Sequence, residues 1–247
     1  MKNLLRSFVL AFQLLTRIPM PAVTYTPEAM AGSAAFFPLV GLVVGACAVL
    51  VRFALKPHLP AALVAIAVLL ATILLTGALH EDGLADAADA FGAGGSREHM
   101  LQILKDSRIG SYGALALLFS VGVRCLLLLA MPDDRFVAYV VCAHVLCRWT
   151  AAPLAFALPP AREGAGQGSQ LAGKTSLTSL LVSNIFAAAI AVYLLRAHCI
   201  APLLAMLVVT GLSGWYYRRR LGGITGDCFG ATNQLTEIAI YLCGVVH

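Results

Sequence analysis

The sequence predicts an all-α fold: a polytopic integral membrane helical bundle with six to eight membrane segments, forming a single membrane-embedded domain over residues 1–247. Hydrophobic residues make up 60% of the chain and charged residues only 12%, whereas about 25% of the residues in soluble domains are charged. The mean hydropathy is +0.86. Long apolar runs recur along the whole chain, without an internal repeat or a low-complexity tract that would mark a second domain.

Six apolar segments are long enough to cross a hydrocarbon core of about 30 Å. They are residues 33–55, 59–79, 112–131, 136–158, 177–195 and 199–217. Two shorter segments, 4–15 and 235–246, raise the count to eight if they also cross. The first of them lacks a small-residue cleavage site, so it is not read as a removed signal peptide. An interfacial position is its alternative.

Basic residues gather on one side of the bundle if the six segments alternate. That side carries Lys2, Arg6, Arg17, Arg97, Lys105, Arg108, Arg162, Lys174, Arg218, Arg219 and Arg220. The other side carries only Lys56, Arg135 and Arg196, with Arg52 nearby. The positive-inside rule therefore predicts an inner (cytoplasmic) membrane protein whose loops at 80–111, 159–176 and 218–234 face the cytoplasm. Nucleic acid binding gains no support, because no basic stripe with interleaved aromatic residues is present.

Three aspartates follow the second predicted span, at positions 82, 86 and 89. At roughly 100° per residue, Asp82, Asp86 and Asp89 lie within about 60° of one another on one helical face. Carboxylates this close repel one another unless a cation lies between them, and the chain has only 12 acidic residues to distribute. Clustered hard oxygen ligands suit Mg²⁺, with Mn²⁺ as the second choice. The alternative is a polar helix start with Asp82 as its cap.

The same loop continues with Lys105-Asp106-Ser107-Arg108-Ile109-Gly110. Lys105 and Arg108 are three residues apart, so both can face one anion, and Arg suits bidentate contact with phosphate. Asp106 is a candidate for a further metal ligand. In the alternative interpretation, the two cations only mark topology and Asp106 pairs with Arg108.

The last polar loop, residues 221–231, lies on the same predicted side as the aspartates. Its glycines permit close backbone approach, and Thr225 and Asp227 add a hydroxyl and a carboxylate. Asp227 is a candidate metal ligand or general base, and Thr225 a candidate substrate contact. Helix packing around Gly226 and Gly230, with Asp227 as a cap, is the alternative.

Arg148 lies near the middle of the fourth predicted span, where an unpaired charge costs about 3 kcal/mol or more. We therefore expect it to meet a carboxylate, a phosphate or a water-filled cavity. Arg124 lies closer to a span end and is expected to snorkel. Arg162 follows the fourth span and can contact substrate or pair with Glu163.

His144 and Asn184 are expected to be hydrogen-bonded residues of the helix core, and the seven cysteines to be buried as small apolar side chains.

These motifs, in this order, are similar to those of the cobalamin synthase family, adenosylcobinamide-GDP ribazoletransferase. The matching segments are residues 15–19 with Pro21, 37–41 with Gly45, His80, 82–86 with Asp89, 105–110, Arg148-Trp149, 161–164, 223–227 and Gly230-Ala231. The sequence departs from the family pattern at Glu81, commonly apolar, and at Gln234, often Glu. Neither of these is assigned a ligand role.

The resemblance implies a single catalytic domain that transfers a substituted phosphate group late in cobalamin biosynthesis. Adenosylcobinamide-GDP and α-ribazole, or its 5′-phosphate, give adenosylcobalamin, or its 5′-phosphate, and GMP. Asp82, Asp86 and Asp89 would hold Mg²⁺, with Asp106 or Asp227 as a further ligand or the base, and Lys105, Arg108, Arg148, Arg162 and Thr225 would bind substrate. The expected partners are the corrinoid nucleotide, α-ribazole and the lipid bilayer. Small residues in the spans also permit a homo-oligomer.

Two other functions use similar residues. A CDP-alcohol phosphotransferase also has an aspartate-rich helix, but its motif places Ala-Arg after Asp-Gly, where this chain has Leu84-Ala85. A divalent cation transporter would place acids at mid-membrane on broken spans, whereas these aspartates are expected in a loop at the membrane edge.

Overall fold

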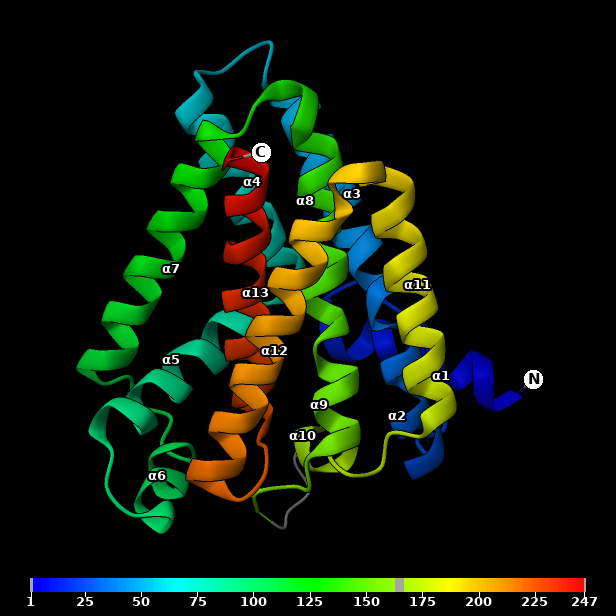
Figure 1. Cartoon of the computed structure of the whole chain (residues 1–247), viewed down its shortest axis with the longest axis vertical. Helices are drawn as coiled ribbons and strands as arrows, with labels where there is room; N and C mark the ends of the chain where they lie inside the picture. Colours follow the sequence, from blue (N-terminus) through cyan, green and yellow to red (C-terminus); the bar gives the residue numbers. More distant parts are fainter. Residues whose placement is uncertain (1, 163–166, 247) are drawn as a thin grey trace.

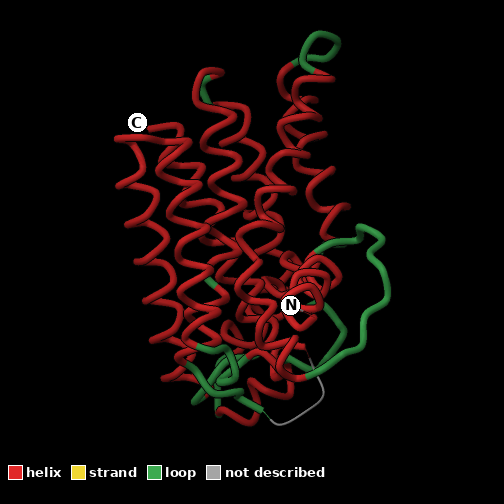
Figure 2. The backbone as a smooth tube through the Cα atoms, turned by 90° about the vertical axis from the view of Figure 1, so that its right-hand side faces the viewer, coloured by secondary structure: helices red, strands yellow, loops and turns green. Residues whose placement is uncertain are grey.

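The structure is a computed structural model that describes residues 2–162 and 167–246. Within these ranges the chain is a bundle of helices without a regular strand, and the loops gather mainly at its two ends (Figures 1 and 2). The helices are α1 (Lys2–Leu15), α2 (Pro27–Ser33), α3 (Phe37–Leu55), α4 (Ala61–Thr76), α5 (Leu79–Ala93), α6 (Arg97–Ile103), α7 (Ser111–Ala130), α8 (Asp133–Trp149), α9 (Ala151–Ala157), α10 (Gln167–Leu171), α11 (Leu177–Leu195), α12 (Ile200–Leu221) and α13 (Gly226–Val246).

Each of the six predicted spans is helical. Four apolar segments among the described residues are long and apolar enough to cross a membrane: Pro27–Leu55, Ser111–Ala130, Asp133–Ala157 and Leu177–Leu221. The last of these comprises α11 and α12, which are joined by a 3₁₀ turn at Arg196–Cys199 and run in opposite directions (Figure 1). The predicted span 59–79 is shorter than expected, because α4 ends at Thr76. The predicted segments 4–15 and 235–246 correspond to α1 and to the second half of α13.

Helix α8 forms the centre of the bundle. It packs against α3, α11 and α13, and its residues from Tyr139 to Trp149 are all buried. The largest apolar core surrounds it and includes Phe136, Leu146, Ile240 and Tyr241. Large apolar side chains of α7, α11 and α12, by contrast, face outward. This is the arrangement expected of a bundle whose outer helices contact lipid.

Asp82, Asp86 and Asp89 lie on one helix, α5, as predicted, and this helix takes the place of part of the loop expected between the second and third spans. Helix α5 spans 15 residues and is bent by 88° from α4. Gly77 and Ala78 both adopt left-handed backbone conformations at the bend, with φ of 65° and 57°. Because left-handed residues end a helix, α4 stops there and the chain turns across the bundle as α5. Figure 1 shows α5 running obliquely toward α6, away from the axes of α7 and α13.

The end of the bundle that holds α6, α10 and the α12–α13 turn is the basic end (Figure 1). The segments that carry Arg97, Lys105, Arg162 and the run Arg218–Arg220 meet there. The opposite end holds the α3–α4, α7–α8 and α11–α12 turns. The lysine and arginine asymmetry predicted from the sequence is therefore an asymmetry between the two ends of the bundle.

Candidate active site

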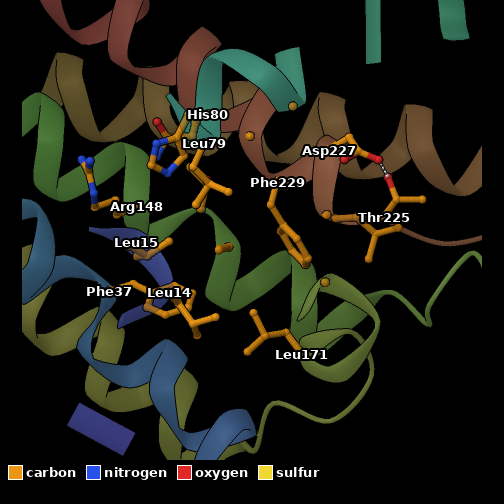
Figure 3. Close-up of a pocket in the computed structure, with 18 of the residues that line it drawn as sticks. Leu14, Leu15, Phe37, Leu79, His80, Arg148, Leu171, Thr225, Asp227 and Phe229 are labelled. Atoms are coloured by element: carbon orange, nitrogen blue, oxygen red, sulfur yellow. Dashed lines mark hydrogen bonds between the residues drawn. The ribbon is translucent and has the colours of Figure 1, made fainter. Parts of the chain in front are cut away.

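A cavity of about 350 Å³ lies between α5, α8, α10, α13 and the C-terminal end of α1 (Figure 3). Its polar lining includes Asp82, Arg148, Arg162, Thr225 and Asp227. All five residues were predicted as site residues, and they come from four separate parts of the chain, since only Thr225 and Asp227 are near neighbours in the sequence. The structure brings them to one cavity.

Asp82 and Asp227 reach the cavity because α5 and α13 are in backbone contact. A Cβ atom on Gly83 would lie 2.9 Å from the Asp227 carbonyl oxygen and 3.1 Å from the Gly230 Cα. Only glycine allows this approach, so the crossing places the residues beside Gly83 next to the start of α13. The helix-packing role that was the alternative for Gly230 is confirmed, and this packing places Asp82 and Asp227 in the lining of the same cavity.

The aspartates act on one another electrostatically. Partial burial, followed by the charges of Asp82, Asp227 and Asp89, raises the pKa of Asp86 to about 6. Among the described residues, the side chains of Asp82 and Asp86 have neither a hydrogen bond nor an ion pair. Asp82 is exposed and Asp86 half-buried, and the role of both as metal ligands stays a prediction.

Asp89 has a different environment. It is buried, and its two oxygens accept backbone N–H groups of Gly110 and Gly113 at 2.7 and 2.8 Å. These groups belong to the first turn of α7, so Asp89 caps that helix and its charge is favourable at the helix N-terminus. A Cβ on Gly113 would lie 2.8 Å from the Ala85 carbonyl oxygen, which explains the glycine there. The structure thus uses Asp89 as a cap, and its role as a metal ligand stays a prediction.

The predicted metal-binding aspartates are not drawn together around one point. In the described part of the chain, only His144, Cys147 and Glu237 have three potential ligand atoms within 4.8 Å of one another. In that group, His144 is hydrogen-bonded to Tyr241 and lies against the Arg148 guanidinium. The prediction for His144 as a hydrogen-bonded core residue is confirmed. Asn184 is likewise a helix contact, which accepts a hydrogen bond from Trp149 at 2.7 Å.

Arg148 is buried on α8 and lines the cavity, as its position in the span predicted. Its Nη1 donates to the His144 carbonyl oxygen at 3.1 Å, whereas its Nε has no partner in residues 2–162 and 167–246. No described carboxylate lies within 4.0 Å of its guanidinium. A buried guanidinium without a carboxylate favours an anionic ligand. Figure 3 shows its side chain at the edge of the cavity, on the side of His80.

Arg162 and Thr225 complete the polar lining. Thr225 donates its hydroxyl to Asp227 at 3.2 Å (Figure 3), and the Arg162 charge acts on the same carboxylate. Arg162 also lies 3.5 Å from the Leu104 carbonyl oxygen. Its proposed alternative partner, Glu163, is outside the described residues.

Lys105, Asp106 and Arg108 do not line the cavity. Arg108 pairs with Asp106 at 2.6 Å, and this pair holds the pKa of Asp106 at about 2. The pairing that was the alternative interpretation is therefore present, and the role of Asp106 as a metal ligand stays a prediction. Lys105 and Arg108 are exposed. Phosphate binding by these two cations stays a prediction.

One buried network was missed. Arg124 is almost completely buried, not snorkelling, and its Nη1 lies 3.0 Å from Glu81 and 3.6 Å from Glu237. Gln234 donates to Glu81 at 3.2 Å and accepts from Ser120 at 3.0 Å. The network joins α5, α7 and α13. The available signal was Glu237 within the apolar second half of α13, but its partner Arg124 was assigned to a span end.

The apolar part of the cavity lining was missed as well. Leu14 and Leu15 of α1, Phe37, Leu171 and Phe229 form it, and they belong to one apolar cluster. In the sequence these side chains occur in apolar runs, where a cavity wall and a lipid-facing surface look alike. The cysteines were expected to be buried: Cys142, Cys147 and Cys228 are, whereas Cys47, Cys125, Cys199 and Cys243 are half-buried.

Comparison with known proteins supplies the family. Residues 7–245 match the family model described as cobalamin-5-phosphate synthase. Curated proteins named adenosylcobinamide-GDP ribazoletransferase are similar over nearly their whole length. The protein from Leptothrix cholodnii is 40% identical, with 96% of this chain and 94% of that protein covered. The protein from Klebsiella pneumoniae is 38% identical, with 97% and 99% covered.

No solved structure matches this chain. The family model and the relatives nevertheless cover all the segments that build the cavity, from the end of α1 to α13. The chain belongs to the cobalamin-5-phosphate synthase family.

Proposed function

We propose that this chain joins adenosylcobinamide-GDP to α-ribazole, or to its 5′-phosphate, and releases GMP. The observation that carries the proposal is the cavity itself, where the unpaired carboxylate of Asp82 and the carboxylate-free guanidinium of Arg148 face the same space. A transfer between a diphosphate and an alcohol needs both kinds of group. The family and the names of the relatives supply the substrates.

The reaction forms one bond and breaks one. A ribose hydroxyl of α-ribazole attacks the phosphorus that carries the cobinamide, the bond to the bridging oxygen breaks, and GMP leaves with that oxygen. Because the 5′-phosphate is also a proposed substrate, the attacking hydroxyl is not the 5′ one. Its proton passes to a carboxylate, for which Asp82, Asp86 and Asp227 are the candidates. Arg148 and Arg162 are placed to bind the anionic oxygens.

Divalent metal binding fits the residues present. Partial burial, and then the charges of the neighbouring aspartates, raise the pKa of Asp86, and carboxylate oxygens are the donors that Mg²⁺ and Mn²⁺ prefer. The ion would be held by Asp82, Asp86 and Asp227. Asp89 instead accepts hydrogen bonds from the backbone at the start of α7, and Asp106 forms an ion pair with Arg108. Bound there, the metal would neutralise diphosphate charge and favour departure of GMP.

The proposed location is the cytoplasmic membrane, with the cavity open toward the cytoplasm. The basic end of the bundle lies on the side of α6, α10 and the start of α13, and the latter two elements border the cavity. The positive-inside rule assigns that end to the cytoplasm.

Cation transport remains the alternative from another class. The 88° bend between α4 and α5 has the form of the broken spans that transporters use, so the fold alone does not exclude it. A transporter would move a divalent ion without producing GMP. Membership of this family favours the transferase.

Purified protein in nanodiscs, supplied with Mg²⁺ and both precursors, tests the proposal. We expect GMP release that requires both precursors and stops when EDTA removes the metal. Mn²⁺ should restore it. Absence of GMP release from a monodisperse, folded preparation would refute the transferase function, and metal-independent release would refute the metal proposal alone.

A further inference from the structure

We propose that the apolar end of the cavity is the binding site for the aromatic base of α-ribazole, and that its side chains select this base against more polar ones. This inference rests on the proposed function and assigns one end of its cavity. The apolar end consists of Leu14, Leu15, Phe37, Leu171 and Phe229.

The cavity has two chemically different ends. In Figure 3, Leu14, Leu15, Phe37 and Leu171 lie on one side, whereas Asp227, Thr225 and His80 lie on the other. Phe229 projects between them (Figure 3). A molecule that fills the cavity must therefore be apolar at one end and polar at the other. Ligand pockets commonly pair an apolar lining with a few polar groups that fix orientation.

The substrates offer three candidate groups for the apolar end: the guanine, the corrin ring and the dimethylbenzimidazole. Guanine carries an amide, an amino group and a carbonyl. None of the five apolar side chains can donate to or accept from these groups, and each buried polar group without a partner costs about 1–3 kcal/mol. Guanine is therefore a poor occupant.

Dimethylbenzimidazole is a better occupant. It is flat and aromatic, carries two methyl groups and has no N–H donor once it is joined to ribose. Phe37 and Phe229 can contact its faces or edges, and the leucines its methyl groups. With the base at this end, its ribose extends toward Asp82 and Asp227, where the attacking hydroxyl is needed.

Size supports the same assignment. A cavity of about 350 Å³ lies at the small end of the usual range for ligand sites, about 300–1,000 Å³. A nucleoside matches that size. The corrin ring with its amide side chains is several times larger than a nucleoside, so it has to remain outside while its diphosphate reaches in.

Phe229→Ala and Phe229→Leu, compared with Leu235→Ala, test the assignment. Leu235 is on the same helix but is exposed and outside the cavity. Phe229→Ala should raise KM for α-ribazole roughly tenfold, which is about 1.4 kcal/mol of binding, and Phe229→Leu should raise it less. KM for adenosylcobinamide-GDP should stay within about twofold in both, and Leu235→Ala should match the wild type.

Base selectivity provides the second measurement. Leu14→Asn places an amide at the apolar end, so the preference for α-ribazole over the corresponding α-riboside of adenine should fall by roughly tenfold. Leu5→Asn, an exposed position on the same helix, should leave the preference unchanged. Thermal melting of each variant in nanodiscs verifies that the protein is folded.

Three results would overturn the assignment. A raised KM for adenosylcobinamide-GDP alone would place the guanine or corrin at the apolar end. Unchanged KM values in the Phe229 variants together with unchanged selectivity in Leu14→Asn would show that the apolar end binds another group, such as a lipid chain. A wild-type protein that releases no GMP would refute the proposed function itself, which is a separate outcome.

Discussion

Glu81 and Asp82 are neighbours in the chain, yet they belong to two different regions. The charge of Glu81 has partners within the protein, whereas that of Asp82 has none among the described residues. Glu81 is buried against Arg124 and Gln234, inside a network closed by Glu237. Asp82 is exposed, lines the cavity and has no hydrogen bond or ion pair among the described residues. Charges that have protein partners hold helices together, and charges without them are available to a ligand.

The largest expected effect is on stability. Arg124→Met should destabilise the protein by about 3–5 kcal/mol, because it leaves the Glu81 and Glu237 carboxylates buried beside each other without a cation. Arg218→Met, an exposed position, should have little effect. Thermal melting in detergent or nanodiscs measures both.

The triple variant Arg124→Met, Glu81→Gln, Glu237→Gln should recover part of the loss, since no uncompensated charge then remains. If Arg124→Met melted like the wild type, the network would not hold α5, α7 and α13 together.

A smaller effect is expected for Asp89→Asn. An amide has one acceptor oxygen where the carboxylate has two, so a backbone N–H of Gly110 or Gly113 loses its partner. The expected cost is about 1–2 kcal/mol in unfolding free energy. Asp86→Asn is the matched control, because Asp86 makes no such bond in the described structure and its removal relieves repulsion. Equal melting temperatures for the two variants would contradict the capping role.

The smallest effect is expected for Arg108→Lys. The Arg108 guanidinium already pairs with Asp106 outside the cavity, so kcat/KM for the nucleotide substrate should change by less than about threefold, or roughly 0.6 kcal/mol. Arg218→Lys serves as the control for basic charge at the same end of the bundle. A fall of roughly tenfold in Arg108→Lys alone would instead support the phosphate contact that its motif suggested.

The sequence was informative where a charge stood out from apolar surroundings. Asp82, Asp227 and Arg148 could be selected in this way, and all three line the cavity. The helical class followed from composition and from the lengths of the apolar runs. These are properties of individual segments, so one sequence suffices to identify them.

Features that depend on contacts between segments could not be predicted. The bend before α5 uses Ala78 in a left-handed conformation, which alanine seldom adopts. The capping of α7 by Asp89 could not be predicted, because Gly110 at the start of that helix is 21 residues away in the chain. Arg124 was assigned to a span end, and its two glutamates come from α5 and α13.

The central claim is that the unpartnered carboxylates perform the chemistry, and the adjacent pair Glu81→Gln and Asp82→Asn tests it most directly. Each variant replaces one carboxylate by an amide of nearly the same volume, one residue apart on α5. The measurement is GMP released per folded molecule at saturating substrates and Mg²⁺. We expect Asp82→Asn to lose about two orders of magnitude or more and Glu81→Gln to stay within about threefold of the wild type. Near-native turnover by Asp82→Asn, or an equal loss in both variants, would contradict the account.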